Sequence, residues 1–399
     1  MSRLTLFHVG FLFLILFFTT TAKAQKEAET FNVDSTLYEY YQRCQEYLLE
    51  PVVLSMSDTL FRMAGERHDE RMQAVAIATR LDYYYFQGTN EDSVIHYTNK
   101  VKEFAKATHQ PKYYYFAWAN RLITYYLKTS RTNIALYEVQ NMLKEAQEED
   151  DKTGLSRCYN IMSQIYTIKR FDSMAFEWRL KEIELTEKYN IENYNISQTY
   201  AQIANYYISQ KKQKEALRAV EKAVSTANSS TQQISAKLEY VNYYSKFGDF
   251  QAAEKILKEC QIAFEQDKRL ESIKKRLYNI ECLYYQQTKQ YQKALEAAEM
   301  QEKEEHRLSE SILSSSHYRT QGEIYQKMGN MNMAVKYLQM YINTDDSLKI
   351  ANEQVASSEF ATLLNVEKLN AEKKELMLQA QEKELHNKTT LIISLIILL

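Results

Sequence analysis

The sequence predicts an all-α solenoid of about seven to eight helix pairs, followed by a long helix and the first part of a transmembrane segment. Two observations carry the solenoid. Seven tyrosines recur at intervals of 37 to 41 residues, and each is followed nine residues later by a small apolar residue. The chain also has only 7 glycines and 2 prolines in 399 residues, which leaves little room for a turn-rich β fold. We therefore expect helices throughout.

The spacing of the tyrosines is an internal repeat. The repeat tyrosines are Tyr85, Tyr126, Tyr166, Tyr207, Tyr244, Tyr285 and Tyr325. The small residues that follow them are Val94, Ala135, Ala175, Ala216, Ala253, Ala294 and Ala334. A single unit is too small to bury its own apolar face, so the units stack in a row and leave an extended concave surface. The repeat predicts a protein that works by binding along a groove.

The last unit shows how one repeat is built. Tyr318, Gly322 and Tyr325 follow each other at intervals of four and three residues, which places them on one helix face. Gly329 then ends this helix, and Leu338 belongs to the apolar face of a second one. A side chain larger than that of Gly322 would push the two backbones apart. Gly322 and the repeat alanines therefore mark the predicted helix crossings.

This pattern resembles the tetratricopeptide repeat, and the resemblance covers roughly Val75 to Ile342. A degenerate unit is predicted before it, with Tyr47 and Met56 at the matching interval and Pro51 between its helices. The family repeat is about 34 residues long, whereas these units are mostly 40 or 41, so we expect longer helices or outer turns. The resemblance implies a solenoid of helix hairpins over 25–345.

The N-terminus has the features of an export signal. Arg3 precedes an apolar run over 6–18, and the small-x-small pattern Ala22-Lys23-Ala24 follows. A secretory signal peptide is predicted over 1–24, with the mature chain beginning at Gln25. An uncleaved anchor is the alternative, although the apolar run is short for one. We expect the repeats in the periplasm of a Gram-negative bacterium, anchored to the inner membrane.

The C-terminal part is predicted to be a long charged helix over 346–388, because it lacks proline and glycine and is dense in Glu, Lys, Gln and Leu. An apolar seam runs along it through Val366, Leu369, Leu376 and Ala380. This seam predicts a coiled coil and a homodimer formed through 347–388. The apolar residues 389–399 are predicted to start a transmembrane helix, and a hydrophobic tail packed on another surface is the alternative.

This order of parts resembles that of bacterial membrane sensors, in which periplasmic tetratricopeptide repeats precede one transmembrane helix and a cytoplasmic histidine kinase or helix-turn-helix output domain. The resemblance implies a periplasmic ligand- or protein-binding module of a membrane-bound signalling protein, which passes a signal through the juxtamembrane helix. A membrane-tethered protein–protein interaction scaffold without signalling output is the alternative reading.

The sequence offers little sign of catalysis. It contains no His-Glu-x-x-His, no phosphate-binding loop and no Gly-x-Ser-x-Gly, so we predict no enzyme within this span and no catalytic, cofactor-binding or metal-binding residue. A formal charge of −2 provides no basic footprint for nucleic acid. The four cysteines are interpreted as buried free thiols, and a bridge between Cys260 and Cys282 is the alternative.

Polar residues on the first helices of the units are the candidate binding residues, because these helices line the concave face in this architecture. They are Asn120, Asn160, Gln164, Asn205, Asn242, Arg276, Asn279 and Arg319. Amides and guanidinium groups suit hydrogen bonding to a peptide backbone or a glycan. The predicted partner is therefore a protein, a peptide or a glycan, and an ordinary polar surface is the alternative.

Overall fold

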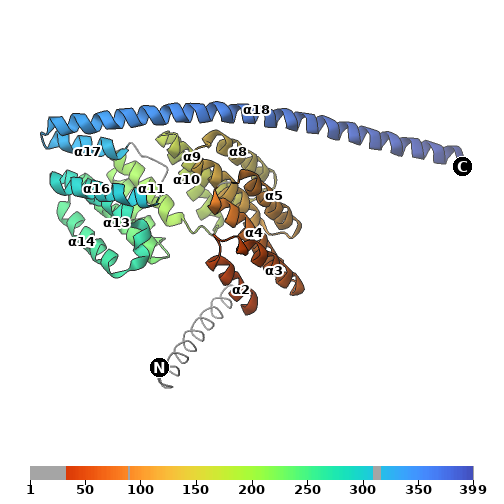
Figure 1. The fold of residues 1–399 in the computed structure, drawn as a ribbon, viewed down its shortest axis with the longest axis horizontal. Helices are drawn as coiled ribbons and strands as arrows, with labels where there is room; N and C mark the ends of the chain where they lie inside the picture. Colours follow the sequence, from red (N-terminus) through yellow and green to blue (C-terminus); the bar gives the residue numbers. More distant parts are fainter. Residues whose placement is uncertain (1–32, 89, 309–315, 399) are drawn as a thin grey trace, which may run out of the picture. The chain divides into compact units, whose positions relative to one another are not determined.

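The computed structural model describes residues 33–88, 90–308 and 316–398. The predicted signal peptide lies outside them. Within these ranges the regular secondary structure is helical throughout, with no strand (Figure 1). The chain divides into two compact units, unit 1 over Met1–Ile165 and unit 2 over Tyr166–Leu399. The all-α prediction is confirmed for the described residues.

Unit 1 is a stack of helix hairpins. Its hairpins are α2 (Ser35–Glu46) with α3 (Val52–Glu66), α4 (Glu70–Gln87) with α5 (Glu91–Ala107), and the segment α6 (Pro111–Tyr115), η1 (Phe116–Ile123) and α7 (Thr124–Lys128) with α8 (Thr132–Glu148). Helix α9 (Lys152–Ile168) follows. The first helices are neighbours, since α4 contacts both α2 and η1.

Unit 2 repeats the same arrangement. It begins with α10 (Asp172–Tyr189) and continues with the hairpins α11 (Ile196–Ser209) with α12 (Gln213–Ser225), α13 (Ser230–Phe247) with α14 (Phe250–Gln266), α15 (Lys274–Gln287) with α16 (Tyr291–Leu308), and α17 (Ser316–Lys327) with α18 (Met331–Leu398). A short 3-10 helix, η2 (Lys268–Ile273), leads into α15. Helix α13 contacts α11 on one side and α15 on the other, so three first helices lie in a row.

The small residues of the repeat are the closest points of packing. All seven are buried, and none is more than 2% exposed. Two of the repeat tyrosines, Tyr85 and Tyr126, are buried, and the other five are half-buried. The N-terminal extra hairpin also exists as α2 and α3, but its Tyr47 caps α2 and is 40% exposed. The matching interval suggested that Tyr47 is a core tyrosine, but its exposure shows that it is not.

Six of the first helices end in the same way after their repeat tyrosine. In six units the residue four positions later has a left-handed backbone; these residues are Ser130, Arg170, Lys211, Gly248, Lys289 and Gly329. The backbone N–H of the following residue donates to the tyrosine carbonyl at 2.8–3.0 Å in all six. This hydrogen bond satisfies a carbonyl that the helix end would otherwise leave unpaired. The repeat tyrosine thus marks the helix end as well as the core.

The last helix, α18, continues far past its hairpin partner α17 (Figure 1). It runs without a break across residues 345 and 346, where the sequence placed a domain boundary, and it includes the apolar residues 389–398. Among the described residues, no helix has an apolar stretch of the length and hydropathy needed to cross a membrane. The transmembrane segment and the dimer seam remain predictions.

The four cysteines are free thiols and all four are buried. Cys260 belongs to the core between α13, α14 and α15, whereas Cys282 packs in the next core with Ala294 and Ile324. The two thiols therefore lie in different layers of the solenoid, and the alternative of a bridge between them is not realised. Burial raises the pKa of each of the four, which keeps the thiols protonated and unreactive.

Candidate binding grooves

The first helices of unit 2 form a polar cavity of about 470 Å³. Residues of α11, α13, η2, α15 and α16 line it. Its polar lining consists of hydroxyls, amides and two cations, without a carboxylate; examples are Ser197, Gln198, Ser235, Lys275, Arg276 and Asn279. The cavity therefore presents hydrogen-bond donors and positive charge to whatever enters it.

The repeat itself builds one row of this lining. Gln198, Ser235 and Arg276 each lie nine residues before a repeat tyrosine, on α11, α13 and α15. Equivalent positions on stacked hairpins lie next to one another, so the three side chains form a polar row across the cavity. A ligand that runs across the three helices meets each of them in turn.

A buried carboxylate orients the arginine of this row. Glu239 of α13 is 1% exposed, and its Oε1 pairs with Nη2 of Arg276 on the neighbouring α15. Burial lowers the pKa of Arg276, which stays cationic because the ordinary pKa of arginine is far above neutral pH. The pair fixes the guanidinium group at the wall of the cavity.

A smaller cavity of about 240 Å³ lies on the same three helices. Asn205 and Asn242 line it, and Nδ2 of Asn242 donates to Oδ1 of Asn205 at 2.6 Å. Lys246 and Gln287 complete its polar side. The two cavities together hold four of the predicted groove residues, because Arg276 and Asn279 line the larger one.

The other four predicted residues line neither cavity. In unit 1, Oδ1 of Asn120 accepts a hydrogen bond from Arg157 at 2.8 Å. Gln164 donates to Oδ1 of Asn160 at 2.6 Å. On α17, Arg319 pairs with Glu323 one turn further along the same helix, at 2.9 Å. These side chains bond to neighbouring side chains, and their role in binding stays a prediction.

Unit 1 contains a larger cavity that the sequence did not reveal. It measures about 730 Å³ and lies between α2, α4 and the α6–η1 segment. Tyr38, Tyr41, Tyr113 and Phe116 line it. The sequence interpretation assigned the excess of tyrosines to packing. The sequence signal for this cavity was the run of three tyrosines at 113–115. In the structure Tyr114 and Tyr115 are buried, whereas Tyr113, which lines the cavity, is half-exposed.

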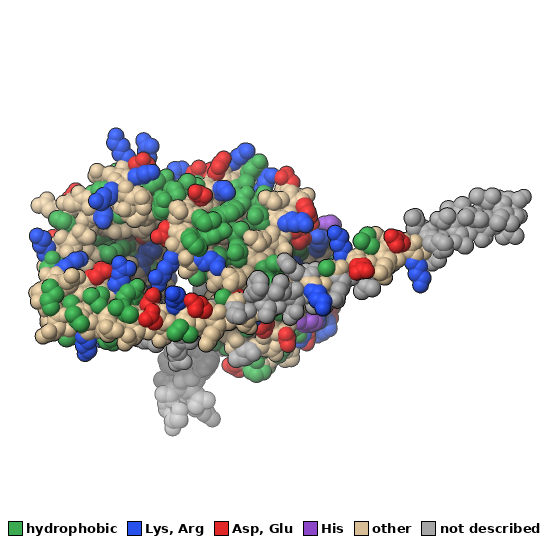
Figure 2. Space-filling model, turned by 90° about the horizontal axis from the view of Figure 1, so that it is seen from above, with side chains coloured by type: hydrophobic (Ala, Val, Ile, Leu, Met, Phe, Trp, Pro, Cys, Tyr) green, Lys and Arg blue, Asp and Glu red, His purple; other side chains and the backbone are tan. Residues whose placement is uncertain are grey.

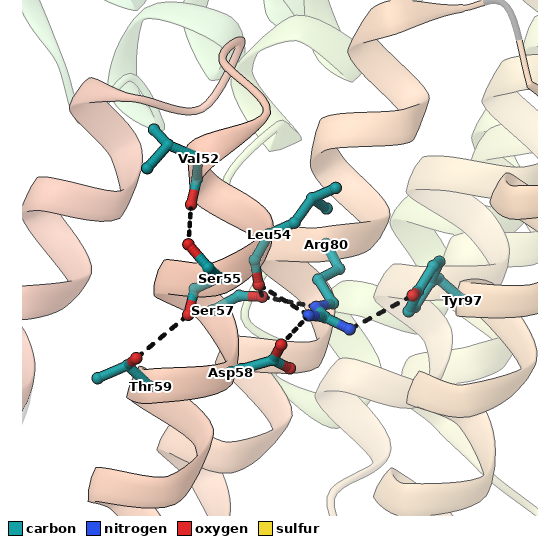
Figure 3. Close-up of polar contacts among 8 residues, drawn as sticks. All are labelled: Val52, Leu54, Ser55, Ser57, Asp58, Thr59, Arg80 and Tyr97. Carbon is teal, nitrogen blue, oxygen red and sulfur yellow. Dashed lines mark hydrogen bonds and ion pairs between the residues drawn. The ribbon is translucent and has the colours of Figure 1, made fainter.

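Two arginines hold the hairpins of unit 1 together at equivalent positions, five residues before a repeat tyrosine. Arg80 donates from Nε to the Ser57 hydroxyl at 2.7 Å and from Nη2 to the Leu54 carbonyl at 2.8 Å, and it pairs with Asp58 (Figure 3). Arg121 pairs with Asp82, and both side chains are largely buried. In the α13 repeat of unit 2 this position holds Glu239, which pairs instead with the arginine of the next first helix, α15.

The described residues contain no cluster of potential metal ligands. No group of three or more His, Cys, Asp or Glu side chains among them is placed to hold a metal ion. On the face drawn in Figure 2, Lys and Arg side chains are interspersed with Asp and Glu.

The comparisons with known proteins concern the fold alone. No protein-family model and no curated protein matches the chain. The solved structures that resemble it include the apo form of the quorum sensor NprR from B. thuringiensis, with 15% identity and a TM-score of 0.47, over 80% of this chain and 91% of that one. A Rap protein complexed with competence and sporulation factor has 13% identity and a TM-score of 0.47, and the match covers 84% of this chain and 99% of that one. A tetratricopeptide repeat protein from Parabacteroides merdae has 13% identity and a TM-score of 0.43, and the match covers 81% of this chain and 99% of that one.

Proposed function

We propose that the chain is the periplasmic ligand- or protein-binding region of a membrane-bound signalling protein, and that the cavity of about 470 Å³ in unit 2 captures an extended, acidic peptide segment of a partner protein. The observation that carries the binding proposal is the polar row Gln198, Ser235 and Arg276, which crosses three consecutive first helices. An extended backbone exposes hydrogen-bonding groups at regular intervals, and such a row can bond to them in succession.

The charge of the cavity selects the kind of peptide. Lys275 and Arg276 line it, and Lys246 lines the neighbouring cavity on the same helices. Neither lining contains a carboxylate, and Glu239 is already paired with Arg276. A peptide with Asp or Glu side chains can therefore accept charge-assisted hydrogen bonds from Lys275 or Lys246, whereas a basic peptide finds no carboxylate in either lining.

The signalling part of the proposal rests on α18. This helix begins as the partner of α17 in the last hairpin and continues as one helix to Leu398. No glycine or proline interrupts it between Met331 and Leu398. A continuous helix transmits a rotation or displacement of its first turns along its length, whereas a flexible linker would dissipate it. Export through 1–24 and a membrane segment beginning at 389 would place the repeats in the periplasm.

Peptide display tests the binding site. A library of random peptides is selected on the full chain alone, and the enriched peptides are then measured on Ser235→Trp, which fills the cavity. The enriched peptides should be acidic and should bind Ser235→Trp at least tenfold more weakly than they bind the native chain.

Asn279→Asp adds a carboxylate to the lining and should weaken binding about fivefold, the effect of roughly one ion pair. The matched control is Asn141→Asp on the exposed face of α8, which should leave affinity unchanged. Enriched peptides that bind Ser235→Trp as well as the native chain would refute the site.

Cysteine crosslinking distinguishes a sensor from a scaffold. The four native cysteines are buried, so a single cysteine introduced at Leu369 or Glu372 reports on contacts between chains. In a sensor, an enriched peptide should change the crosslinking yield at Leu369 more than at Glu372, because only Leu369 lies on the predicted seam. An identical yield with and without peptide would favour the scaffold without output.

A further inference from the structure

The cavity of unit 1 differs in chemistry from the polar groove of unit 2. Four aromatic rings line it, those of Tyr38, Tyr41, Tyr113 and Phe116. We propose that this cavity is a separate binding site for a small organic anion with an aromatic or long aliphatic body. The proposal does not depend on peptide binding in unit 2, since each cavity is built from the helices of its own unit.

The apolar body is accommodated by the rings and by the side chains between them. Met72, Val75 and Ala78 lie along the stretch of α4 that faces the cavity. Its volume of about 730 Å³ falls within the range of about 300–1,000 Å³ that is usual for small-molecule sites. Sites of this kind combine a mostly apolar lining with a few polar groups that orient the ligand. The lining fits a ligand of one or two fused rings.

The charged groups indicate where the head of the ligand lies. Arg71 and Lys112 line the cavity, close to the beginnings of α4 and α6, with His109 just before α6. The one carboxylate in the lining belongs to Asp82, eleven residues along α4 from Arg71, or about 16 Å at the helical rise. Arg71 and Lys112 are the lining cations at this end of the cavity, and we place the anionic head beside them.

The charge at the far end is already compensated. Asp82 pairs with Arg121, and burial raises the pKa of Asp82 despite this pair. The guanidinium group of Arg121 also lies over the Phe116 ring, 4.4 Å from its centroid. Asp82 thus contributes little net charge to repel an acid, and the far end accepts the apolar part of the ligand.

A second observation points to the same place. Phe116 is the first residue of η1, an eight-residue π-helix within the first helix of its hairpin. Such segments are rare and are frequently found at functional sites. The π-helix carries Phe116 at the cavity wall and Arg121 over the Phe116 ring. The π-helix and the aromatic cavity therefore coincide, and a binding site accounts for both.

A matched pair of dyes tests the proposal on the full chain. 1-Anilinonaphthalene-8-sulfonate has a fused-ring body and an anionic head, and N-phenyl-1-naphthylamine has the same body without the sulfonate. The chain has two tryptophans, so Trp178→Phe leaves Trp118 in η1 as the one energy donor. Both dyes should give saturable energy transfer from Trp118. Ala78→Trp, measured by dye fluorescence excited directly, should abolish saturable binding of both.

The cation variants test where the head lies. Lys112→Gln and Arg71→Gln should each weaken the sulfonated dye about fivefold, and leave the neutral dye unchanged. The control is Lys144→Gln on the exposed face of α8, which should affect neither dye. Circular dichroism should confirm that each variant is folded. Unchanged binding in a folded Ala78→Trp, or equal losses for both dyes in Lys112→Gln, would overturn the proposal. Lys112 is exposed, so its variant remains informative if Ala78→Trp does not fold.

Discussion

Gly322 of α17 lies directly against Leu338 of α18. A Cβ atom added to Gly322 would be 2.8 Å from Cγ of Leu338 and 3.3 Å from its backbone nitrogen. The backbone of α18 cannot move away without disturbing the hairpin. Gly322→Ala should therefore lower the free energy of unfolding by about 1–3 kcal/mol. Denaturant unfolding of the full chain measures the change.

Gly65→Ala is the control for this substitution. A Cβ at Gly65 of α3 would approach only the flexible end of the Gln73 side chain, at 3.0 Å from Nε2. That side chain can move, and alanine is the better helix former by roughly 0.5–1 kcal/mol. Gly65→Ala should raise stability. A loss of stability at Gly65, or a gain at Gly322, would contradict the packing described.

The repeat alanines should tolerate no enlargement. Ala253 of α14 and Ala294 of α16 are fully buried where helices pack closely. Replacement of either residue by leucine overfills its layer and should cost about 1–3 kcal/mol. The matched control is Ala107→Leu at the exposed end of α5, which should stay within about 0.5 kcal/mol of the native chain. Unchanged unfolding midpoints for Ala253→Leu and Ala294→Leu would argue against the repeat register.

The left-handed helix ends should be improved by glycine. Lys211 and Lys289 have φ values of 57° and 60°, a conformation that costs an L-residue roughly 1–2 kcal/mol. Glycine adopts this conformation without strain, but it also makes the unfolded chain more flexible, which offsets part of the gain. Lys211→Gly and Lys289→Gly should therefore each raise the free energy of unfolding by about 0.5–1 kcal/mol. Gly248 has φ of 91° at the same repeat position, and Gly248→Ala should destabilise. Thermal unfolding of the three variants checks the signs, and a uniform loss would reject the argument.

Lys102 should make stability depend on alkaline pH. Its Nζ lies 3.1 Å from the centroid of the Trp118 ring, and burial lowers the pKa of Lys102 to about 8, with Glu145, Glu138 and Lys106 nearby. Between about pH 8 and the ordinary value of 10.5, the unfolded chain binds this proton and the folded chain does not. Raising the pH through this window therefore stabilises the fold, and the penalty is fully present below it.

Lys102→Met removes that penalty. It should raise the free energy of unfolding by about 1–2 kcal/mol at pH 7, and this gain should disappear by about pH 10.5. Lys100→Met on the exposed side of α5 is the control and should show a difference independent of pH. A constant gain for Lys102→Met from pH 7 to 10.5 would show that Lys102 titrates normally.

The helix hairpins could be predicted from the sequence, because their signals are local and periodic. The spacing from each repeat tyrosine to its small partner identified both helices of a unit, and a glycine such as Gly322 marked a close crossing before any contact was known. Four of the candidate groove residues line cavities of unit 2, and whether they bind a ligand stays a prediction.

The residues that line each cavity could not be predicted from the sequence, because they come together only in the folded chain. The pairs Glu239–Arg276 and Asp82–Arg121 join residues 37 and 39 positions apart, on neighbouring first helices. Which side chains meet there depends on the rotation of each helix, and the eight-residue π-helix that begins at Phe116 changes that rotation. Periodicity places a residue on a helix face, but a cavity forms where several faces fail to fill the space between them. For that reason the aromatic cavity of unit 1 was visible only in the folded chain.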